Sequence, residues 1–285
     1  MYVDNVKEQL RVAIMVACHN RKESTKRCLM TLQGSLQNEG DKQFDLYVYD
    51  DGSTDGTYEM LREEFPSIII IRGNGNAFWC NSMYQLMKQA TGLNYDFYMM
   101  INDDVTFYPN AVSTMFESYY QAKCNCGIVG ATRSSITGEM TYGGRIGNNG
   151  SLLVPNGKIE KCVWADWNCF LIDRKVVERI GVIDGKYQHA WGDYDYDFRM
   201  NKNKIPIYVA VKVIGECEMN SDAGTYMDHT LGRKERLKKL LSPKGMPFYS
   251  YLRYNVKVNG IWGVLKSVYG YCSLIVYILL RKKIG

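Results

Sequence analysis

Carboxylate side chains follow apolar runs at two places in this 285-residue chain. The first is residues 44–51, which end in Asp50-Asp51. The second is residues 97–105, FYMMINDDV, whose apolar run ends at Asn102-Asp103-Asp104. A strand buried on both faces reads as a continuous apolar run, and ligands of open α/β sheets bind at the carboxyl ends of such strands. Mg²⁺ is usually held by one or two carboxylates plus substrate phosphates. The segment therefore predicts a metal-assisted nucleotide-diphosphate site, with a simple turn at Asp103 as the structural alternative.

Three further aspartates, Asp193, Asp195 and Asp197, alternate with aromatic residues. A helix that begins near Asp193 would place Asp193 and Asp197 on one face, where like charges repel by a few tenths of a kcal/mol. Such repulsion needs a compensating role. A general base at Asp193 would supply one, whereas an N-cap at Asp193, worth about 1 kcal/mol, and a solvated face for the other two are the structural alternatives.

Several nucleotide-binding motifs are excluded by spacing. Gly73-Asn-Gly75 lacks the third glycine of a dinucleotide fingerprint, because Phe78 stands in that position, and no P-loop string occurs. A transferase that uses a sugar nucleotide needs a carboxylate for the base or ribose, a metal for the diphosphate and a base for the acceptor hydroxyl. Asp50 or Asp51, Asp104 and Asp193 fit these roles in that order.

Alternating strand and helix patterns are expected to position these residues. Apolar runs predict strands at 11–17, 44–49, 68–71, 97–101 and 127–131, with helical patterns at 24–36, 57–64, 78–90 and 109–121 between them. Such βα units are typical of a parallel, doubly wound sheet whose loops meet at one edge. After Thr132 the many glycines favour turns and short antiparallel strands, followed by a strand within 163–172 and a helix capped by Asp173.

The motifs, taken in their order, resemble those of a known enzyme family. They are residues 17–23 (ACHNRKE), residues 49–56 (YDDGSTDG) and Asn102-Asp103-Asp104, and residues 164–181 resemble an acceptor-side strand and helix. Over residues 10–215 the chain is similar to glycosyltransferase family 2, inverting enzymes of the GT-A type. Residues 191–199 (WGDYDYDFR) resemble a branch that includes rhamnosyltransferase-like enzymes of cell-surface polysaccharide synthesis.

The resemblance implies a fold and a division of the chain. The implied fold is a GT-A-type α/β fold, with a Rossmann-like, doubly wound, mainly parallel sheet, a smaller antiparallel acceptor-side portion and a C-terminal helical tail. Residues 1–230 would form the glycosyltransferase domain, with the nucleotide-binding half at about 1–131 and the acceptor half at 132–230. Residues 231–285 would form a basic, amphipathic helical tail.

The resemblance also implies residue roles. Asp51 would contact the nucleotide base or ribose, Asp104 would reach a divalent metal, Mg²⁺ or Mn²⁺, and Asp193 would be the catalytic base. Asn102 replaces the first aspartate of the family's D-x-D, and Gly192 stands where a glutamate is common. The residues assigned to the nucleotide sugar are Ala17, His19, Asn20, Arg21, Asp50, Asp51, Asn74, Asn76, Trp79, Asn102 and Asp103. Those assigned to the acceptor side are Trp164, Trp167, Asn168, Trp191 and Asp195.

The implied reaction is one in-line displacement that inverts the anomeric configuration. A sugar would move from a UDP- or dTDP-sugar to a hydroxyl of a glycan or lipid-linked acceptor. Two alternatives remain open. One is a nucleotidyl- or phosphotransferase on a similar sheet, and the other is a catalytically silent carbohydrate-binding or scaffold subunit, since Asn102 and Gly192 depart from the acidic pattern.

The charge of the chain is concentrated at its C-terminus. Residues 233–285 hold 12 Lys and Arg and one Glu, a net +11, which leaves −6 for residues 1–232 within the total of +5. Residues 267–280 are 14 uncharged residues ahead of Arg281-Lys282-Lys283, fewer than the roughly 20 that span a bilayer. This pattern favours a helix that lies in the plane of an anionic membrane as an anchor. The alternative is a core helix packed on the catalytic domain or on a partner subunit. No nucleic-acid partner is expected.

The cysteines and the first residues bear on the compartment. The nine cysteines form no C-x-x-C pair, and residues 1–10 are polar rather than typical of a signal peptide. We therefore expect free thiols and a cytoplasmic protein attached peripherally to the inner face of the membrane. A homo-oligomer is left open.

Overall fold

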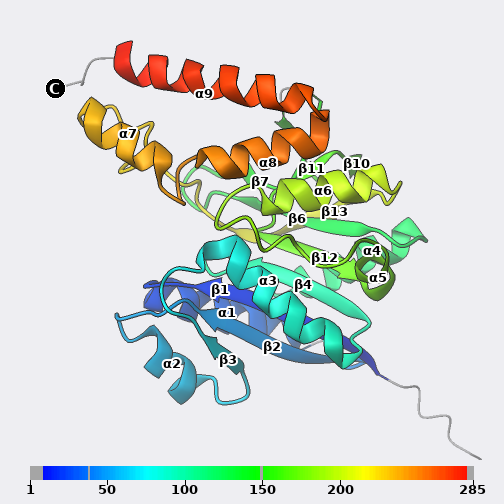
Figure 1. Ribbon diagram of the computed structural model, residues 1–285. Helices are drawn as coiled ribbons and strands as arrows, with labels where there is room; N and C mark the ends of the chain where they lie inside the picture. The colour runs from blue at the N-terminus through cyan, green and yellow to red at the C-terminus, as the bar shows by residue number, and fades with distance from the viewer. Residues whose placement is uncertain (1–8, 38, 148–149, 281–285) are drawn as a thin grey trace, which may run out of the picture.

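Four βα units build the first half of the fold (Figure 1). The computed structural model of the protein describes residues 9–37, 39–147 and 150–280. The four predicted strands and the helices between them are present, close to their predicted bounds. These elements are β1 (Leu10–Cys18), α1 (Lys22–Leu36), β2 (Lys42–Asp50), α2 (Thr57–Glu64), β3 (Ile69–Arg72), α3 (Phe78–Ala90), the short 3₁₀ helix η1 (Thr91–Leu93) and β4 (Phe97–Asn102).

The second half mixes short strands with helices. After β5 (Thr106–Phe107) and α4 (Ala111–Ala122), β6 (Gly127–Arg133) forms the predicted fifth strand. Asp173 caps α5 as predicted, since its side chain accepts a hydrogen bond from the Val176 N–H at 3.1 Å. The remaining elements are β7 (Met140–Tyr142), β8 (Gly144–Ile146), β9 (Ser151–Leu152), β10 (Glu160–Cys162), β11 (Trp164–Ala165), β12 (Cys169–Asp173), α5 (Arg174–Ile180), α6 (Gly192–Lys202) and β13 (Ile207–Glu216).

The strands form one large sheet in the order β10-β13-β6-β12-β4-β1-β2-β3. Strands β3, β2, β1 and β4 are parallel, and β12 lies antiparallel between β4 and β6. A small antiparallel sheet, β11-β8-β9, lies apart from it. The predicted fold class is confirmed. The sequence analysis assigned no strand to residues 207–216, although β13 pairs in parallel with β6.

The register of the parallel strands brings their carboxyl ends level. Ala17 of β1 pairs with Asn102 of β4, and Cys18 pairs with Asp50 of β2. The loops that follow these three strands therefore begin at the same edge of the sheet. This is where ligands of open α/β sheets bind.

Helices cover both faces of the sheet, and each face has its own apolar core. One core joins the sheet to α1, α2 and α4, and the other joins it to α3, α5 and α6. Strand β4 shows why both cores are needed, because Phe97 to Ile101 are all buried and successive side chains point to opposite faces. The continuous apolar run of this strand thus reflects its central place.

Three helices form the C-terminal segment. They are α7 (Arg233–Leu241), α8 (Phe248–Asn259) and α9 (Trp262–Leu280). Figure 1 shows α9 on the outside of the molecule, across α8 and beside α7. Helix α9 has 19 residues and begins at Trp262, before Lys266, so it is longer at its N-terminal end than the predicted uncharged run of residues 267–280. Residues 281–283, counted in the basic flank, lie outside the described residues.

Candidate functional site

Two hollows open at the carboxyl edge of the sheet. The first, named here the strand-end pocket, has a volume of about 280 Å³ and is lined by Ala17, Cys18, His19, Arg21, Asp51, Gly75, Phe78, Trp79, Ser82, Asp103, His189 and Lys244. The second, the α6 pocket, has a volume of about 290 Å³ and is lined by Arg21, Trp79, Asn102, Asp103, Asp104, Tyr142, Asp166, Trp167, Asn168, His189, Ala190, Trp191, Asp193, Tyr194 and Asn220. Four residues line both, so the two pockets are parts of one cleft.

Asp51 organises the loop that closes one side of the strand-end pocket. Its two carboxylate oxygens accept hydrogen bonds from the backbone N–H groups of Gly75 and Phe78, each at 2.9 Å. Gly52 permits this approach, because it has φ +67° and a Cβ there would lie 2.8 Å from the Gly75 nitrogen. Asp51 thus lines the pocket and holds the loop 73–78 in place.

Arg21 connects the loop after β1 to the loop after β4. Its guanidinium forms ion pairs with Asp103 at 2.9 Å and with Asp104 at 3.0 Å. Asp103 is buried and also accepts a hydrogen bond from Thr25 at 3.2 Å. Burial raises the pKa of Asp103 to about 6, against the opposing effect of Arg21. Both oxygens of Asp103 are therefore committed to protein partners.

The metal prediction can be tested against the oxygen atoms that are available. Asn102 Oδ1 accepts a hydrogen bond from the Trp79 indole N–H at 2.7 Å, so the Asn102 amide supports Trp79. Asp104 lines the α6 pocket, with one oxygen on Arg21 and the other 3.5 Å from the Cys217 thiol. Within the described residues no group of three or more His, Cys, Asp and Glu could hold a metal ion. A cation at Asp104, which is paired with Arg21, would need further oxygen ligands from a substrate, such as its phosphates.

Helix α6 presents Asp193 to the α6 pocket. Trp191, just before the helix, has φ +79°, which is unusual for a bulky residue and places the turn in a strained conformation. A Cβ on Gly192 would lie 2.1 Å from the Cys80 sulfur, so the packing against α3 has no room for the glutamate that the family often has there. Phe78, in the strand-end pocket, has a similar left-handed φ of +57°.

The surroundings of Asp193 suit proton exchange near neutral pH. Burial, together with the nearby Asp166 carboxylate, raises the pKa of Asp193 to about 7 against the opposing effect of the Tyr194 N–H. Asp193 Oδ1 accepts that Tyr194 N–H at 2.9 Å, and no other hydrogen bond to Asp193 is found in the described part of the chain. A carboxylate in a pocket with a pKa near the working pH is a candidate general base.

The other two aspartates of α6 face the protein interior. Asp195 is fully buried and forms ion pairs with Lys257 at 2.6 Å and with Arg199 at 3.0 Å. Asp197 is also buried and accepts hydrogen bonds from the Ala165 N–H and the Trp167 indole. Neither side chain is the solvated one that the structural alternative expected. Asp195, assigned to the acceptor, lies outside both pockets.

The described structure brings most of the predicted site residues to the two pockets and places the others elsewhere. Those in the strand-end pocket are Ala17, His19, Arg21, Asp51, Trp79 and Asp103, and those in the α6 pocket include Asn102, Asp104, Trp167, Asn168, Trp191 and Asp193. Asn74 and Asn76 line a separate, open hollow beside Tyr49. Asn20 and Asp50 instead hold loop 53–54: Asn20 bonds Ser53 and Thr54, and Asp50 accepts the Ser53 N–H. Trp164 packs on Tyr194.

Several residues of the cleft were missed by sequence reasoning. Asp166 lines the α6 pocket and is ion-paired with Arg145 at 2.9 Å, and Tyr142 at the end of β7 and Asn220 after β13 reach the same pocket. His189 and Lys244 line the strand-end pocket. Asp166 and His189 lie within segments that were already singled out, whereas no local pattern marks Lys244.

Helix α8 packs directly against the α6 region. The ring of Trp191 lies 5.0 Å from that of Tyr254, and Lys257 of α8 bridges Asp184 and Asp195 at 2.7 and 2.6 Å. Arg253 adds a second bond to Asp184 at 2.7 Å. The expected boundary at 230/231 therefore separates two segments that share buried ion pairs.

Comparison with known proteins agrees with this arrangement. The family model described as Glycosyl transferase family 2 matches residues 13–181. No curated protein sequence matches the chain. Among solved structures, a mannosyltransferase from Pyrobaculum calidifontis in complex with GDP-Man and Mn²⁺ has a TM-score of 0.55 at 11% identity, over 94% of this chain and 75% of that one. S. aureus TarS has a TM-score of 0.55 at 11% identity, over 88% of this chain and 43% of that one. A shorter TarS structure in complex with UDP has a TM-score of 0.51 at 11% identity, over 88% and 71% of the two chains. These similarities show a shared fold.

Proposed function

Because the chain belongs to glycosyl transferase family 2, we propose that it is an inverting enzyme that transfers a sugar from a nucleotide-diphosphate sugar to an acceptor hydroxyl. The observation that carries the proposal is the single cleft that joins Asp51 and Arg21 in the strand-end pocket to Asp193 in the α6 pocket. The donor would lie in the strand-end pocket. The acceptor, a glycan or a lipid-linked saccharide of cell-surface polysaccharide synthesis, would enter the α6 pocket. A UDP- or dTDP-sugar is the expected donor, and a rhamnosyltransferase-like specificity follows the resemblance of residues 191–199.

Asp193 would take the proton of the acceptor hydroxyl as that oxygen attacks the anomeric carbon. The bond from this carbon to the diphosphate breaks on the opposite side, so one displacement inverts the configuration. Trp191 lines the same pocket, is partly exposed and could offer an apolar ring face to a sugar, whereas Trp167 is buried and stacked on Phe170. A general base of this kind typically contributes about 10²- to 10⁴-fold to the rate.

A divalent cation, when bound, would supply charge stabilisation to the departing diphosphate. Asp104 is the residue that would hold it, together with phosphate oxygens of the donor. The Pyrobaculum calidifontis mannosyltransferase, which was solved with Mn²⁺, supports the choice of metal. Arg21 would keep Asp104 oriented through its 3.0 Å ion pair.

The test of the activity is a panel of nucleotide sugars assayed for release of the nucleoside diphosphate, with and without Mg²⁺ or Mn²⁺. We expect release with one nucleotide class, stimulated by a metal. The absence of both binding and release with every donor would overturn the proposal in favour of a silent carbohydrate-binding subunit. Retention of configuration at the anomeric carbon of the product would overturn the inverting mechanism alone.

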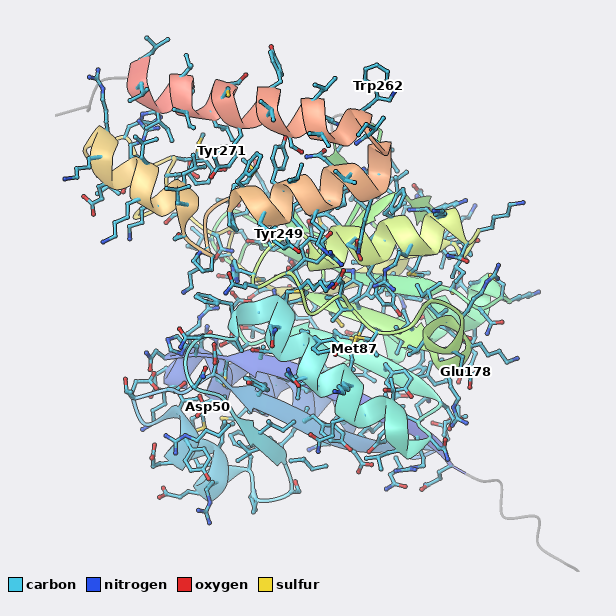
Figure 2. All side chains as sticks on the ribbon, viewed as in Figure 1. Asp50, Met87, Glu178, Tyr249, Trp262 and Tyr271 are labelled. Carbon is cyan, nitrogen blue, oxygen red and sulfur yellow. The ribbon has the colours of Figure 1, made fainter. Side chains whose placement is uncertain are left out.

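The protein would work at the cytoplasmic face of a membrane, on which α9 lies in the plane. By length and composition, α9 is the described helix that could cross a membrane. However, Tyr271 and Ile278 on one of its faces are buried, and Figure 2 shows Tyr271 between α9 and α8. The opposite face is exposed and apolar, with Trp262 71% and Tyr269 78% exposed. An apolar face on a helix that is packed along the protein, with exposed lysines on α7 and α9, suits an in-plane anchor.

The membrane proposal is tested by sedimentation with anionic phospholipid vesicles. Replacing Trp262, Leu265 and Tyr269 by Glu removes exposed apolar groups, so we expect binding to fall about tenfold or more while the fold is kept. Ile136→Glu, at another exposed apolar residue, is the matched control and should bind as the wild type does. Unchanged vesicle binding of the triple variant would rule out α9 as the anchor.

A further inference from the structure

The turn between α7 and α8 brings Lys244 to the strand-end pocket. Lys244 lines this pocket together with Ala17 and Asp51, which lie more than 190 residues earlier in the chain. The turn is tightly packed: the Gly245 N–H bonds the Ser242 carbonyl at 2.9 Å, and a Cβ on Gly245 would lie 2.1 Å from the Lys239 carbonyl oxygen. The position of Lys244 is therefore set by the end of α7.

The charged side chains of the strand-end pocket differ in whether they have partners. Arg21 is neutralised by Asp103 and Asp104, and Asp51 accepts two backbone N–H groups. Lys244 has neither an ion pair nor a hydrogen bond among the interactions of the described residues, and it is exposed. It is thus an unpaired cation at the mouth of a pocket, and such a cation attracts an anionic ligand.

His189 gives a second indication of a ligand beside Lys244. Its Nδ1 atom is buried and has no hydrogen-bond partner within the described structure. Burial and the charge of Lys244 lower the pKa of His189 to about 4, so the ring is neutral at physiological pH. A buried polar atom normally has a partner, and a ligand in the pocket could provide it.

We propose that Lys244 binds the diphosphate of the donor and stabilises it as it leaves, an inference that rests on the proposed glycosyl transfer. The bond between the anomeric carbon and the diphosphate oxygen breaks with its electron pair on that oxygen. The acceptor oxygen forms the new bond to carbon, and its proton passes to Asp193. The ammonium group of Lys244 offsets the charge gained by the diphosphate.

The inference assigns the C-terminal segment a part in donor binding as well as a place on the membrane. Lys244 is held between α7 and α8, and α8 is tied to Asp184 and Asp195 by Lys257. The donor site would therefore be incomplete without residues that lie beyond the segment matched by the family model.

The test compares the affinities of the wild type and of Lys244→Ala for a nucleoside diphosphate, the matching nucleoside and inorganic pyrophosphate, measured by calorimetry on the full chain. We expect Lys244→Ala to weaken binding of the nucleoside diphosphate and of pyrophosphate about tenfold or more, because a charge-assisted bond is lost. Affinity for the nucleoside should not change. Lys244→Arg should retain most of the affinity, and Lys238→Ala, an exposed lysine of α7, is the matched control.

The outcomes separate this inference from the function on which it rests. Equal affinity of the wild type and Lys244→Ala for a nucleoside diphosphate that both bind would overturn the role of Lys244 and leave the glycosyl-transfer proposal standing. A wild type that binds pyrophosphate through Lys244 but binds none of the nucleoside diphosphates would keep the anion site and overturn the nucleotide-sugar function. If Lys244→Ala weakened the binding of the nucleoside and of the nucleoside diphosphate equally, the substitution would disturb the pocket as a whole. That result would overturn the proposed contact between Lys244 and the diphosphate.

Discussion

Two carboxylates that line the cleft, Asp103 and Asp193, differ in their hydrogen bonds more than in their acidity. Burial raises the pKa of both Asp103 and Asp193, to about 6 and about 7. Asp103 has one oxygen on Arg21 and the other on Thr25. Asp193 accepts one N–H from Tyr194, and its second oxygen has no partner among the described residues. A raised pKa alone therefore does not distinguish the two carboxylates, whereas the open oxygen in a pocket makes Asp193 the better candidate for a general base.

The largest effect is expected from Asp193→Asn. The amide cannot accept the acceptor proton, so the rate of sugar transfer should fall about 10²- to 10⁴-fold. Donor affinity should be unchanged, because Asp193 lines only the α6 pocket. The measurement is the initial rate of nucleoside diphosphate release with acceptor present, together with a donor binding isotherm.

Asp222→Asn is the matched control for this substitution, because Asp222 is an exposed aspartate outside both pockets. It should have the wild-type rate. If Asp193→Asn also retains the wild-type rate, the base lies elsewhere, and Asp166 is the next carboxylate of the α6 pocket to test.

The same comparison shows which part of the site the sequence could predict. Arg21, Asp51 and Asp103 follow directly from the ends of strands β1, β2 and β4, because parallel strands end at one edge and their loops must meet there. Periodicity therefore predicted these three members of the strand-end pocket, but not His189 or Lys244. The partner of each side chain was not predictable, since the pairing of Arg21 with Asp103 depends on the register of two strands far apart in sequence.

The α6 pocket was less predictable because segments from several parts of the chain build it. Asp193 was found from its segment alone, whereas Tyr142 ends strand β7, and Asp166 and Asn220 follow strands β11 and β13. The sequence analysis assigned no strand at β13. Lys244 was also not predictable from its local sequence, because only the packing of α7 and α8 on the domain brings it to the cleft.

A smaller effect is expected from Arg21→Gln. Asp103 is buried, so removing its ionic partner should lower the free energy of unfolding at pH 7.5 by about 1–3 kcal/mol, with the low end favoured because the Arg21 side chain is 45% exposed. Loss of the cation raises the pKa of Asp103 further, so the deficit should shrink as the pH falls toward 5 and the carboxyl is protonated. Denaturant unfolding at both pH values measures this.

Arg62→Gln on α2 is the control for Arg21→Gln, because Arg62 is exposed and distant from the cleft. It should change stability little at either pH. A deficit for Arg21→Gln that is the same at pH 5 and pH 7.5 would mean that Asp103 is not the group that Arg21 stabilises.

The last prediction concerns the stability of Asp193→Asn as a function of pH. The folded-state pKa of Asp193, about 7, lies above the ordinary value of 3.8, so between these pH values the folded protein keeps a proton that the unfolded chain has released. The free energy of unfolding of the wild type therefore falls as the pH rises from 4 to 7, because the stabilisation from the retained proton is lost. Asparagine at this position does not titrate, so the variant lacks this pH dependence. The melting temperature of the variant should match the wild type at pH 4 and exceed it by a few degrees at pH 8. Thermal unfolding across this range measures the difference. For the control Asp222→Asn, the difference in melting temperature from the wild type should not change with pH. A constant difference would show that the Asp193 carboxyl titrates near its ordinary pKa, and Asp193 would then differ from Asp103 in its pKa as well as in its hydrogen bonds.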